Sequence, residues 1–336
     1  MIGALDAAPA PPYVPGMAGT ADITSIAVMG AGAVGGFYGA ALAEAGRAVS
    51  FIARGAHLAA LRATGLRVER EGKPPLVLRE VVATDAPAEI GAVDLVLFTP
   101  KSFDLDGAAA SIAPLLHGGT IVLPLLNGLD VADRLGAVIG EEHVLAGICQ
   151  VSSVIAAPGL IRQSGPLNRV ALGEVRGGAS ERASRVARLL QEAGINAEAS
   201  PRMRQEVWRK FYFLDPFASV CALTSATLGP VRDDPDTRAV LVACIAEVRA
   251  LAEAEGAVVP TVAESLAALD ALPAGQTPSL LRAVRQGAPL EIETFQGAVI
   301  RLGEKLGIPT PVHRFIYAAL KLRAGGGGLS GSRAGA

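Results

Sequence analysis

The sequence has few cysteines, few aromatic residues and few charged residues for its length. Of 336 residues, three are cysteine, 4% are aromatic and 18% are charged. The cysteines, Cys149, Cys221 and Cys244, form no CxxC pair, and their odd number suits neither a disulfide framework nor a zinc site. Cysteine usage therefore favours a reducing compartment, and we expect a cytoplasmic protein.

The sequence also lacks an excess of charge of one sign and long hydrophobic runs. Lys and Arg number 30 against 32 Asp and Glu, so no basic field attracts a nucleic acid or an anionic membrane. Apolar runs such as residues 95–98 and 121–126 fall far short of the roughly 18 residues of a membrane span. The four histidines show no metal-ligand spacing. We expect no nucleic-acid, membrane or metal partner, and the oligomeric state stays open, with a homodimer as one option.

What the sequence does contain is ample apolar material, 51% of the residues, in a length that suggests two domains. From residue 24 on, short apolar runs alternate with longer Ala-rich stretches, which is typical of βαβ units around a parallel sheet. The expected strands are residues 25–29, 48–53, 76–83, 94–98, 120–124 and 143–148, and the expected helices are residues 33–45, 56–64, 104–116 and 131–138. Residues 151–164, with a turn at Pro158 and Gly159, and residues 169–173 are predicted to form a hairpin that closes the sheet.

After residue 180 the pattern changes, because apolar residues now recur three or four positions apart. The expected helices are residues 181–192, 204–223, 235–255, 262–271, 278–286 and 290–306, with a short strand at 195–199. We expect a first domain over residues 23–200 and an all-helical domain over residues 201–323. Residues 1–22, rich in Ala, Pro and Gly, and the Gly-rich residues 324–336 are predicted to be a disordered leader and a flexible tail.

A GxGxxG pattern directly follows the first strand and precedes the first helix. Gly30 permits a tight turn, Gly32 lets the backbone approach a pyrophosphate, and Gly35 lets the helix pack against the strand. The predicted phosphate-binding residues are Gly30, Ala31, Gly32, Ala33, Val34 and Gly35. The alternative is a glycine turn that binds nothing. The fold class expected from this context is a Rossmann-type doubly wound α/β domain followed by an all-helical domain.

The position that selects between dinucleotides carries Arg54 rather than an acid. An acid there accepts the ribose 2′-hydroxyl and repels a 2′-phosphate, whereas a guanidinium pairs with a phosphate. This favours NADPH as the cofactor. A solvated arginine at a strand end is the alternative reading.

The sequence resembles those of ketopantoate reductases. The likeness rests on the glycine loop, on Arg54 and Lys101, on Asn127, and on signatures around Lys210, Ser279 and Glu291 in matching order. It covers about residues 23–322. The resemblance implies NADPH-dependent reduction of 2-dehydropantoate (ketopantoate), a 2-oxo acid, to pantoate in pantothenate biosynthesis.

The resemblance also implies roles for individual residues. Lys210 is the catalytic lysine, and a ketone reductase needs such a proton donor for the oxygen that gains charge. Glu291 is its acidic partner, although a carboxylate at the start of the expected helix would also be stabilised by the helix dipole. Ser279 is expected to bind substrate, with helix capping by Thr277 or Ser279 as the alternative.

Two further residues follow strands of the expected sheet. Lys101 and Asn127 come just after the strands at residues 94–98 and 120–124, where a doubly wound sheet opens its ligand crevice. By resemblance, Lys101 lies near the cofactor, and Asn127 contacts both the nicotinamide ribose and the substrate. An asparagine before a glycine is also ordinary turn chemistry.

The sequence departs from the family after Lys210. Where members often carry asparagines one and two turns later, it has Leu214 and Ala218, and Asp215 and Ser219 lie one residue further round the helix. This leaves two alternatives: a reductase of the same fold that acts on another 2-oxo acid, and a redox sensor that binds NADPH without catalysis.

Overall fold

The computed structural model describes residues 22–326, so the expected leader and most of the expected tail lie outside the described residues. The chain forms two compact units, which divide inside helix α6. We call Ile23–Phe211 the sheet unit and the part from Tyr212 on the helical unit. Each is described by itself.

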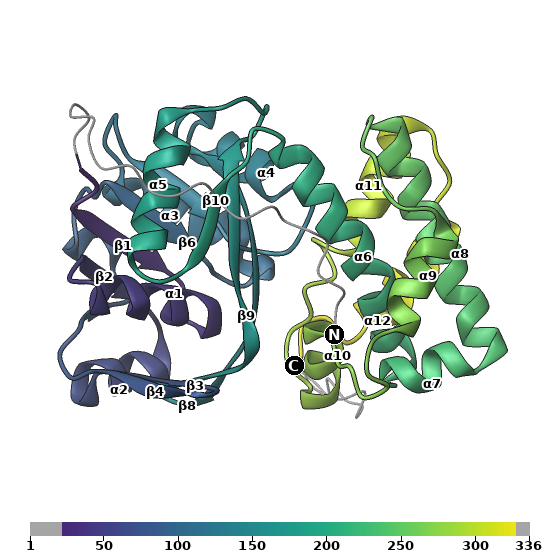
Figure 1. The fold of residues 1–336 in the computed structure, drawn as a ribbon, viewed down its shortest axis with the longest axis horizontal. Helices are drawn as coiled ribbons and strands as arrows, with labels where there is room; N and C mark the ends of the chain where they lie inside the picture. Colours follow the sequence, from purple (N-terminus) through teal and green to yellow (C-terminus); the bar gives the residue numbers. More distant parts are fainter. Residues whose placement is uncertain (1–21, 327–336) are drawn as a thin grey trace, which may run out of the picture. The chain divides into compact units, whose positions relative to one another are not determined.

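The sheet unit is built around a parallel sheet of five strands in the order β5-β2-β1-β6-β7 (Figure 1). The strands are β1 (Ser25–Met29), β2 (Ala48–Ile52), β5 (Val82–Thr84), β6 (Leu95–Phe98) and β7 (Ile121–Pro124). Each neighbouring pair runs parallel. The predicted α/β class with a parallel sheet is confirmed.

Helices cover both faces of this sheet, because successive strand residues point to opposite faces. They are α1 (Ala33–Glu44), α2 (Gly55–Thr64), α3 (Leu105–Ser111), α4 (Val131–Ile139) and α5 (Glu181–Glu192). In β1, Ile26 and Val28 belong to an apolar cluster shared with α1 and α5, whereas Ala27 and Met29 belong to one shared with α3 and α4. This two-sided burial explains why the strands are apolar throughout.

A second sheet has the order β10-β9-β3-β4, with β8 paired to β9. Its strands are β3 (Leu66–Arg70), β4 (Lys73–Leu78), β8 (Leu145–Ala157), β9 (Leu160–Glu174) and β10 (Asn196–Ala199). The predicted hairpin and its turn are confirmed, with Gly159 at a φ of +75°. We expected this hairpin to close the parallel sheet, and that expectation is wrong. Strand β9 instead pairs with β3 and β10 in the second sheet.

The single strand expected at residues 76–83 is wrong. The chain leaves β4, in the second sheet, and enters β5, in the first, so one apolar stretch serves two sheets. Strand β3 was not predicted, since its apolar–polar alternation is short and rests on only two apolar residues, Leu66 and Val68.

The helical unit contains the second half of α6 (Met203–Thr224) and six further helices within the described residues (Figure 1). They are α7 (Leu228–Asp233), α8 (Pro235–Ala254), α9 (Val262–Asp270), α10 (Ser279–Gln286), α11 (Gln296–Leu306) and α12 (Pro311–Lys321). The expected helix over residues 290–306 begins only at Gln296, after a turn. Helices α7 and α12 were not predicted: α7 is short, and prolines precede and open α12, where the first position of a helix tolerates them.

Candidate functional site

The turn after β1 and the first turn of α1 can be formed only with glycine at two positions. Gly30 has a φ of +90°, and a Cβ there would lie 2.7 Å from the backbone nitrogen of Pro100. A Cβ on Gly35 would lie 2.5 Å from the carbonyl oxygen of Gly30 and 2.8 Å from a methyl carbon of Val28. Both glycines are therefore explained by the protein's own packing, with or without a ligand.

Gly32 differs from these two, because nothing in the protein requires it. The nearest heavy atom to a Cβ at Gly32 is the Cδ1 of Ile155, at 3.9 Å. Gly32 is the N-cap of α1 and supplies no side-chain acceptor, so the first-turn N–H groups lack an intrahelical or capping partner. A Cβ at Gly32 would therefore make only ordinary van der Waals contacts. An uncrowded position beside uncapped N–H groups and the positive end of a helix fits the pyrophosphate of a dinucleotide.

The other residues of the predicted loop differ in what they offer. Ala31 is buried and donates its N–H to the carbonyl oxygen of Ile52, at 2.8 Å, so this group is already engaged. Ala33 and Val34 are half-buried in the first turn of α1. Their contact with a cofactor stays a prediction.

Arg54, Lys101 and Asn127 follow β2, β6 and β7, whose carboxyl ends share one edge of the parallel sheet with the glycine loop. Lys101 is exposed and Asn127 half-buried. Arg54 immediately precedes α2, and its Nη1 donates to Oδ2 of Asp104 at 2.8 Å. The structure thus brings the predicted cofactor residues of the sheet unit to one edge, whereas Asp104 was not predicted.

Lys210, on α6, is half-buried near Cys149 of β8. Burial raises the pKa of the Cys149 thiol, and the positive charge of Lys210 opposes that rise. The same thiol donates to the carbonyl oxygen of Leu125 at 3.4 Å, two residues before Asn127. Lys210 and the segment after β7 therefore neighbour one buried cysteine, which stays a neutral thiol.

Ser279 and Glu291 lie in the helical unit. Ser279 is the first residue of α10, whose N-cap is Pro278, and neither Thr277 nor Ser279 caps the helix with its side chain. The Thr277 hydroxyl instead donates to the carbonyl oxygen of Gly275 at 3.0 Å. Glu291 is half-buried in a turn five residues before α11, so the expectation that it opens a helix is wrong. The roles predicted for Ser279 and Glu291 stay predictions.

Asp215 and Ser219 are fully buried in the helical unit and belong to a polar network that was not predicted. Asp215 Oδ2 contacts Nε2 of His313 at 2.7 Å, and His313 Nδ1 contacts Oε2 of Glu247 at 2.6 Å. The Ser219 hydroxyl donates to Asp215 at 3.4 Å and accepts from Nε2 of Gln296 at 2.6 Å. These side chains are thus engaged with one another and do not replace the amides missing at positions 214 and 218.

The charge of His313 follows from its two partners. Both ring nitrogens face carboxylate oxygens, which accept hydrogen bonds when ionised, so both nitrogens carry protons. Burial alone would lower the pKa of His313, but Asp215 and Glu247 raise it to about 9. Burial would raise the pKa of Glu247, but hydrogen bonds from His313 and from the backbone N–H groups of Val312 and His313 hold it low.

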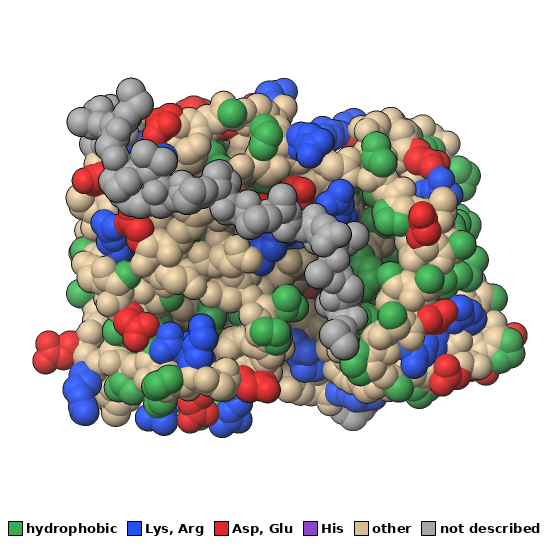
Figure 2. All heavy atoms as spheres, viewed as in Figure 1, with side chains coloured by type: hydrophobic (Ala, Val, Ile, Leu, Met, Phe, Trp, Pro, Cys, Tyr) green, Lys and Arg blue, Asp and Glu red, His purple; other side chains and the backbone are tan. Residues whose placement is uncertain are grey.

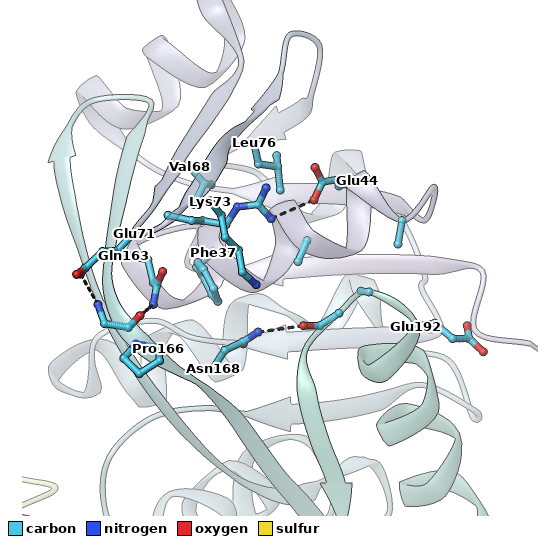
Figure 3. A pocket seen from close by; sticks show the side chains of 16 residues that line it. Phe37, Glu44, Val68, Glu71, Lys73, Leu76, Gln163, Pro166, Asn168 and Glu192 are labelled. Carbon is cyan, nitrogen blue, oxygen red and sulfur yellow. Dashed lines mark hydrogen bonds and ion pairs between the residues drawn. The ribbon is translucent and has the colours of Figure 1, made fainter. Parts of the chain in front are cut away.

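A cavity of about 330 Å³ lies elsewhere in the sheet unit (Figure 3). Its wall includes Glu44 at the end of α1, paired with Arg70 at 3.3 Å, together with Glu71, Lys73 and Phe37. Its lining includes none of the predicted nucleotide-binding residues, which are residues 30–35, Arg54, Lys101 and Asn127. This cavity is distinct from the predicted nucleotide site.

Surface charge, helix composition and the grouping of possible metal ligands bear on other kinds of site. Figure 2 shows basic and acidic side chains interspersed over the face in view. None of the helices between residues 22 and 326 combines the length and the apolar composition that a membrane crossing requires. In the same residues, no three His, Cys, Asp or Glu side chains are grouped so as to hold a metal ion.

Comparison with family models gives two matches that together span most of the chain. Residues 26–177 match the model described as "Ketopantoate reductase PanE/ApbA". Residues 202–324 match "Ketopantoate reductase PanE/ApbA C terminal".

Individual relatives agree with the family models. A 2-dehydropantoate 2-reductase of Mesorhizobium japonicum is 32% identical over 317 residues, which cover 88% of this chain and 96% of that protein. The crystal structure of a putative ketopantoate reductase from Ralstonia solanacearum is 33% identical, with a TM-score of 0.82, and covers 90% of this chain and 98% of that one. A D-mandelate dehydrogenase solved with NADH and anilino(oxo)acetate, 24% identical with a TM-score of 0.80 over 89% of this chain and 98% of that one, shares the fold.

Proposed function

The chain belongs to the ketopantoate reductase family, and from that premise we propose that it reduces a 2-oxo acid to the 2-hydroxy acid with NADPH. It is an oxidoreductase of a family that uses pyridine nucleotides. The finer proposal concerns the cofactor form, the substrate and the residues that act. 2-Dehydropantoate is the first substrate to test, which would place the enzyme in cytoplasmic pantothenate biosynthesis.

The observation that best supports the proposal is the space at Gly32. A glycine that the protein's own packing does not require, beside uncapped N–H groups, is explained by a ligand that approaches the backbone closely. NADPH held there and by Arg54, Lys101 and Asn127 would supply the hydride. A fold that kept the glycine loop for packing alone would have no reason to leave this position open.

The protein's own contribution to the reaction is a proton and a binding geometry. Lys210 as an ammonium donates a proton to the carbonyl oxygen of the 2-oxo acid, and the oxygen becomes the product hydroxyl. Asn127 and Ser279 hold the substrate through hydrogen bonds, and Glu291 helps to orient the ammonium. The neighbouring Cys149 stays neutral, so it neither competes for the proton nor pairs with Lys210.

A second substrate class is favoured by the apolar positions after Lys210. Leu214 is half-buried and Ala218 buried, and neither can donate a hydrogen bond to a hydroxyl on the substrate. A site without amide donors discriminates weakly for a hydroxylated side chain. 2-Oxo acids with aliphatic or aromatic side chains are therefore the alternative to 2-dehydropantoate.

The test is to follow loss of NADPH absorbance with a panel of 2-oxo acids that includes 2-dehydropantoate and apolar analogues. We expect turnover with at least one member. Preference for apolar members would select the alternative substrate class, and NADPH binding without turnover of any member would favour a redox sensor and contradict the proposed reaction.

A further inference from the structure

The ion pair between Arg54 and Asp104 joins two loops that flank the glycine loop. Arg54 follows β2, and Asp104 ends a short 3-10 helix (Ser102–Asp104) that follows β6. Strands β2 and β6 are the two neighbours of β1 in the sheet, so their loops border the loop after β1 on either side. In an open α/β sheet this is where a dinucleotide binds.

The pair is placed where a ligand can reach and rearrange it. The Arg54 side chain is 65% exposed and that of Asp104 37% exposed, with the two atoms 2.8 Å apart. An exposed pair of this kind contributes little to stability. It matters for the charge that a ligand meets, because it sets a carboxylate beside the arginine that would hold a 2′-phosphate.

We propose that Asp104 is a specificity-determining residue that limits the preference for NADPH over NADH. The inference rests on the proposed function, because it assigns Asp104 to the same nucleotide site. A 2′-phosphate must share Arg54 with a carboxylate that repels it. A ribose 2′-hydroxyl can instead donate to that carboxylate. The expected outcome is an enzyme that uses both cofactors, with NADPH ahead by about tenfold or less.

The first turn of α3 provides a matched control. Asp106 lies there, two residues after Asp104, and pairs with Arg134 of α4 at 2.9 Å, not with Arg54. Replacement of either aspartate by asparagine removes one negative charge from this segment. Only the change at Asp104 releases Arg54.

The experiment measures equilibrium binding of NADPH and of NADH by titration calorimetry, without substrate, to wild type, Asp104→Asn, Asp106→Asn and Arg54→Ala. We expect Asp104→Asn to raise the ratio of NADPH to NADH affinity about tenfold and Asp106→Asn to leave it within about twofold. Arg54→Ala, which keeps the carboxylate alone, should bind NADH more tightly than NADPH. Melting temperatures of all four proteins check that the variants fold.

The outcomes separate the two proposals. Binding of a nucleotide with the same ratio in wild type and Asp104→Asn would overturn the role of Asp104 and leave the proposed function standing. An equal change of the affinity ratio in Asp106→Asn would also overturn the role of Asp104, because the effect would then come from the loss of any nearby negative charge. Absence of binding by either nucleotide in wild type would overturn the proposed function and the role of Asp104 with it.

Discussion

The sheet unit and the helical unit place their polar residues in opposite ways. In the sheet unit, the candidate cofactor residues lie on loops at the ends of parallel strands, and the Arg54–Asp104 pair is open to solvent. In the helical unit, the His313–Asp215 pair is fully buried among helices. The same kind of charge contact is therefore accessible to solvent and ligands in one unit and enclosed in the core of the other.

Burial changes how much stability is lost when an ion pair is broken. An exposed pair exchanges with water and costs little to break, whereas removal of one partner of a buried pair leaves an uncompensated charge in a medium that solvates it poorly. Four predictions follow from the roles that we assign to the two units.

The first concerns activity. Lys210→Ala should lower the single-turnover rate of hydride transfer by about 10²–10⁴, because a general acid contributes about that much. NADPH affinity should change little, since the phosphate loop is untouched. The control is Arg209→Ala, an exposed neighbour on the same helix that should retain the rate. A Lys210→Ala rate above about a tenth of wild type would contradict the assignment.

The second concerns the buried network. His313→Leu removes the one cation between Asp215 and Glu247, and we expect the free energy of unfolding in urea to fall by about 3–5 kcal/mol. Asp215→Asn leaves one charge pair and should cost less than half as much. The surface counterpart, Arg54→Ala, should cost less than about 1 kcal/mol. Equal losses in His313→Leu and Arg54→Ala would break the contrast between the units.

The third concerns two glycines of one loop. Gly35→Ala places a methyl group against the carbonyl oxygen of Gly30 and should lower stability by about 1–3 kcal/mol. In Gly32→Ala the added methyl group makes only ordinary van der Waals contacts, so the melting temperature should stay unchanged while NADPH affinity falls by about tenfold or more. Unchanged NADPH affinity in Gly32→Ala would argue against a pyrophosphate at this position.

The fourth concerns pH. The pKa of His313 is about 9 in the folded protein against about 6.5 when unfolded, so its contribution is fully present below pH 6.5 and is lost as pH rises through 9. Between pH 7 and pH 9 this amounts to about 2 kcal/mol of stability. Urea denaturation across this range measures it. In Asp215→Asn, with one carboxylate fewer, the loss should begin at lower pH, and superimposable profiles would contradict the role of His313.

Prediction from the sequence succeeded where short-range patterns decide the structure. The strand, glycine loop and helix from Ser25 to Glu44 were predicted closely, because a continuous apolar run followed by the glycine pattern marks both elements within 20 residues. The placement of Glu291 failed, since a turn before α11 interrupts a stretch whose apolar spacing still suggests a helix.

The residues that were missed have partners far away in the chain. Asp104 meets Arg54 across 50 residues, and Asp215 meets His313 across 98. No local spacing records either contact. His313 in particular stands alone in the sequence, with no neighbouring ligand or catalytic residue to single it out.

The sequence by itself determined the parallel sheet, the glycine loop, the arginine after β2 and the helical second half, because each is encoded by the period and the chemistry of neighbouring residues. Tertiary packing was needed to show which charges meet, that a side chain at Gly32 would meet ordinary contacts while one at Gly35 would clash, and that a histidine lies between two buried carboxylates. These features depend on packing between distant segments. Packing sets burial, and burial decides whether a charged pair is a replaceable surface contact or a requirement for folding.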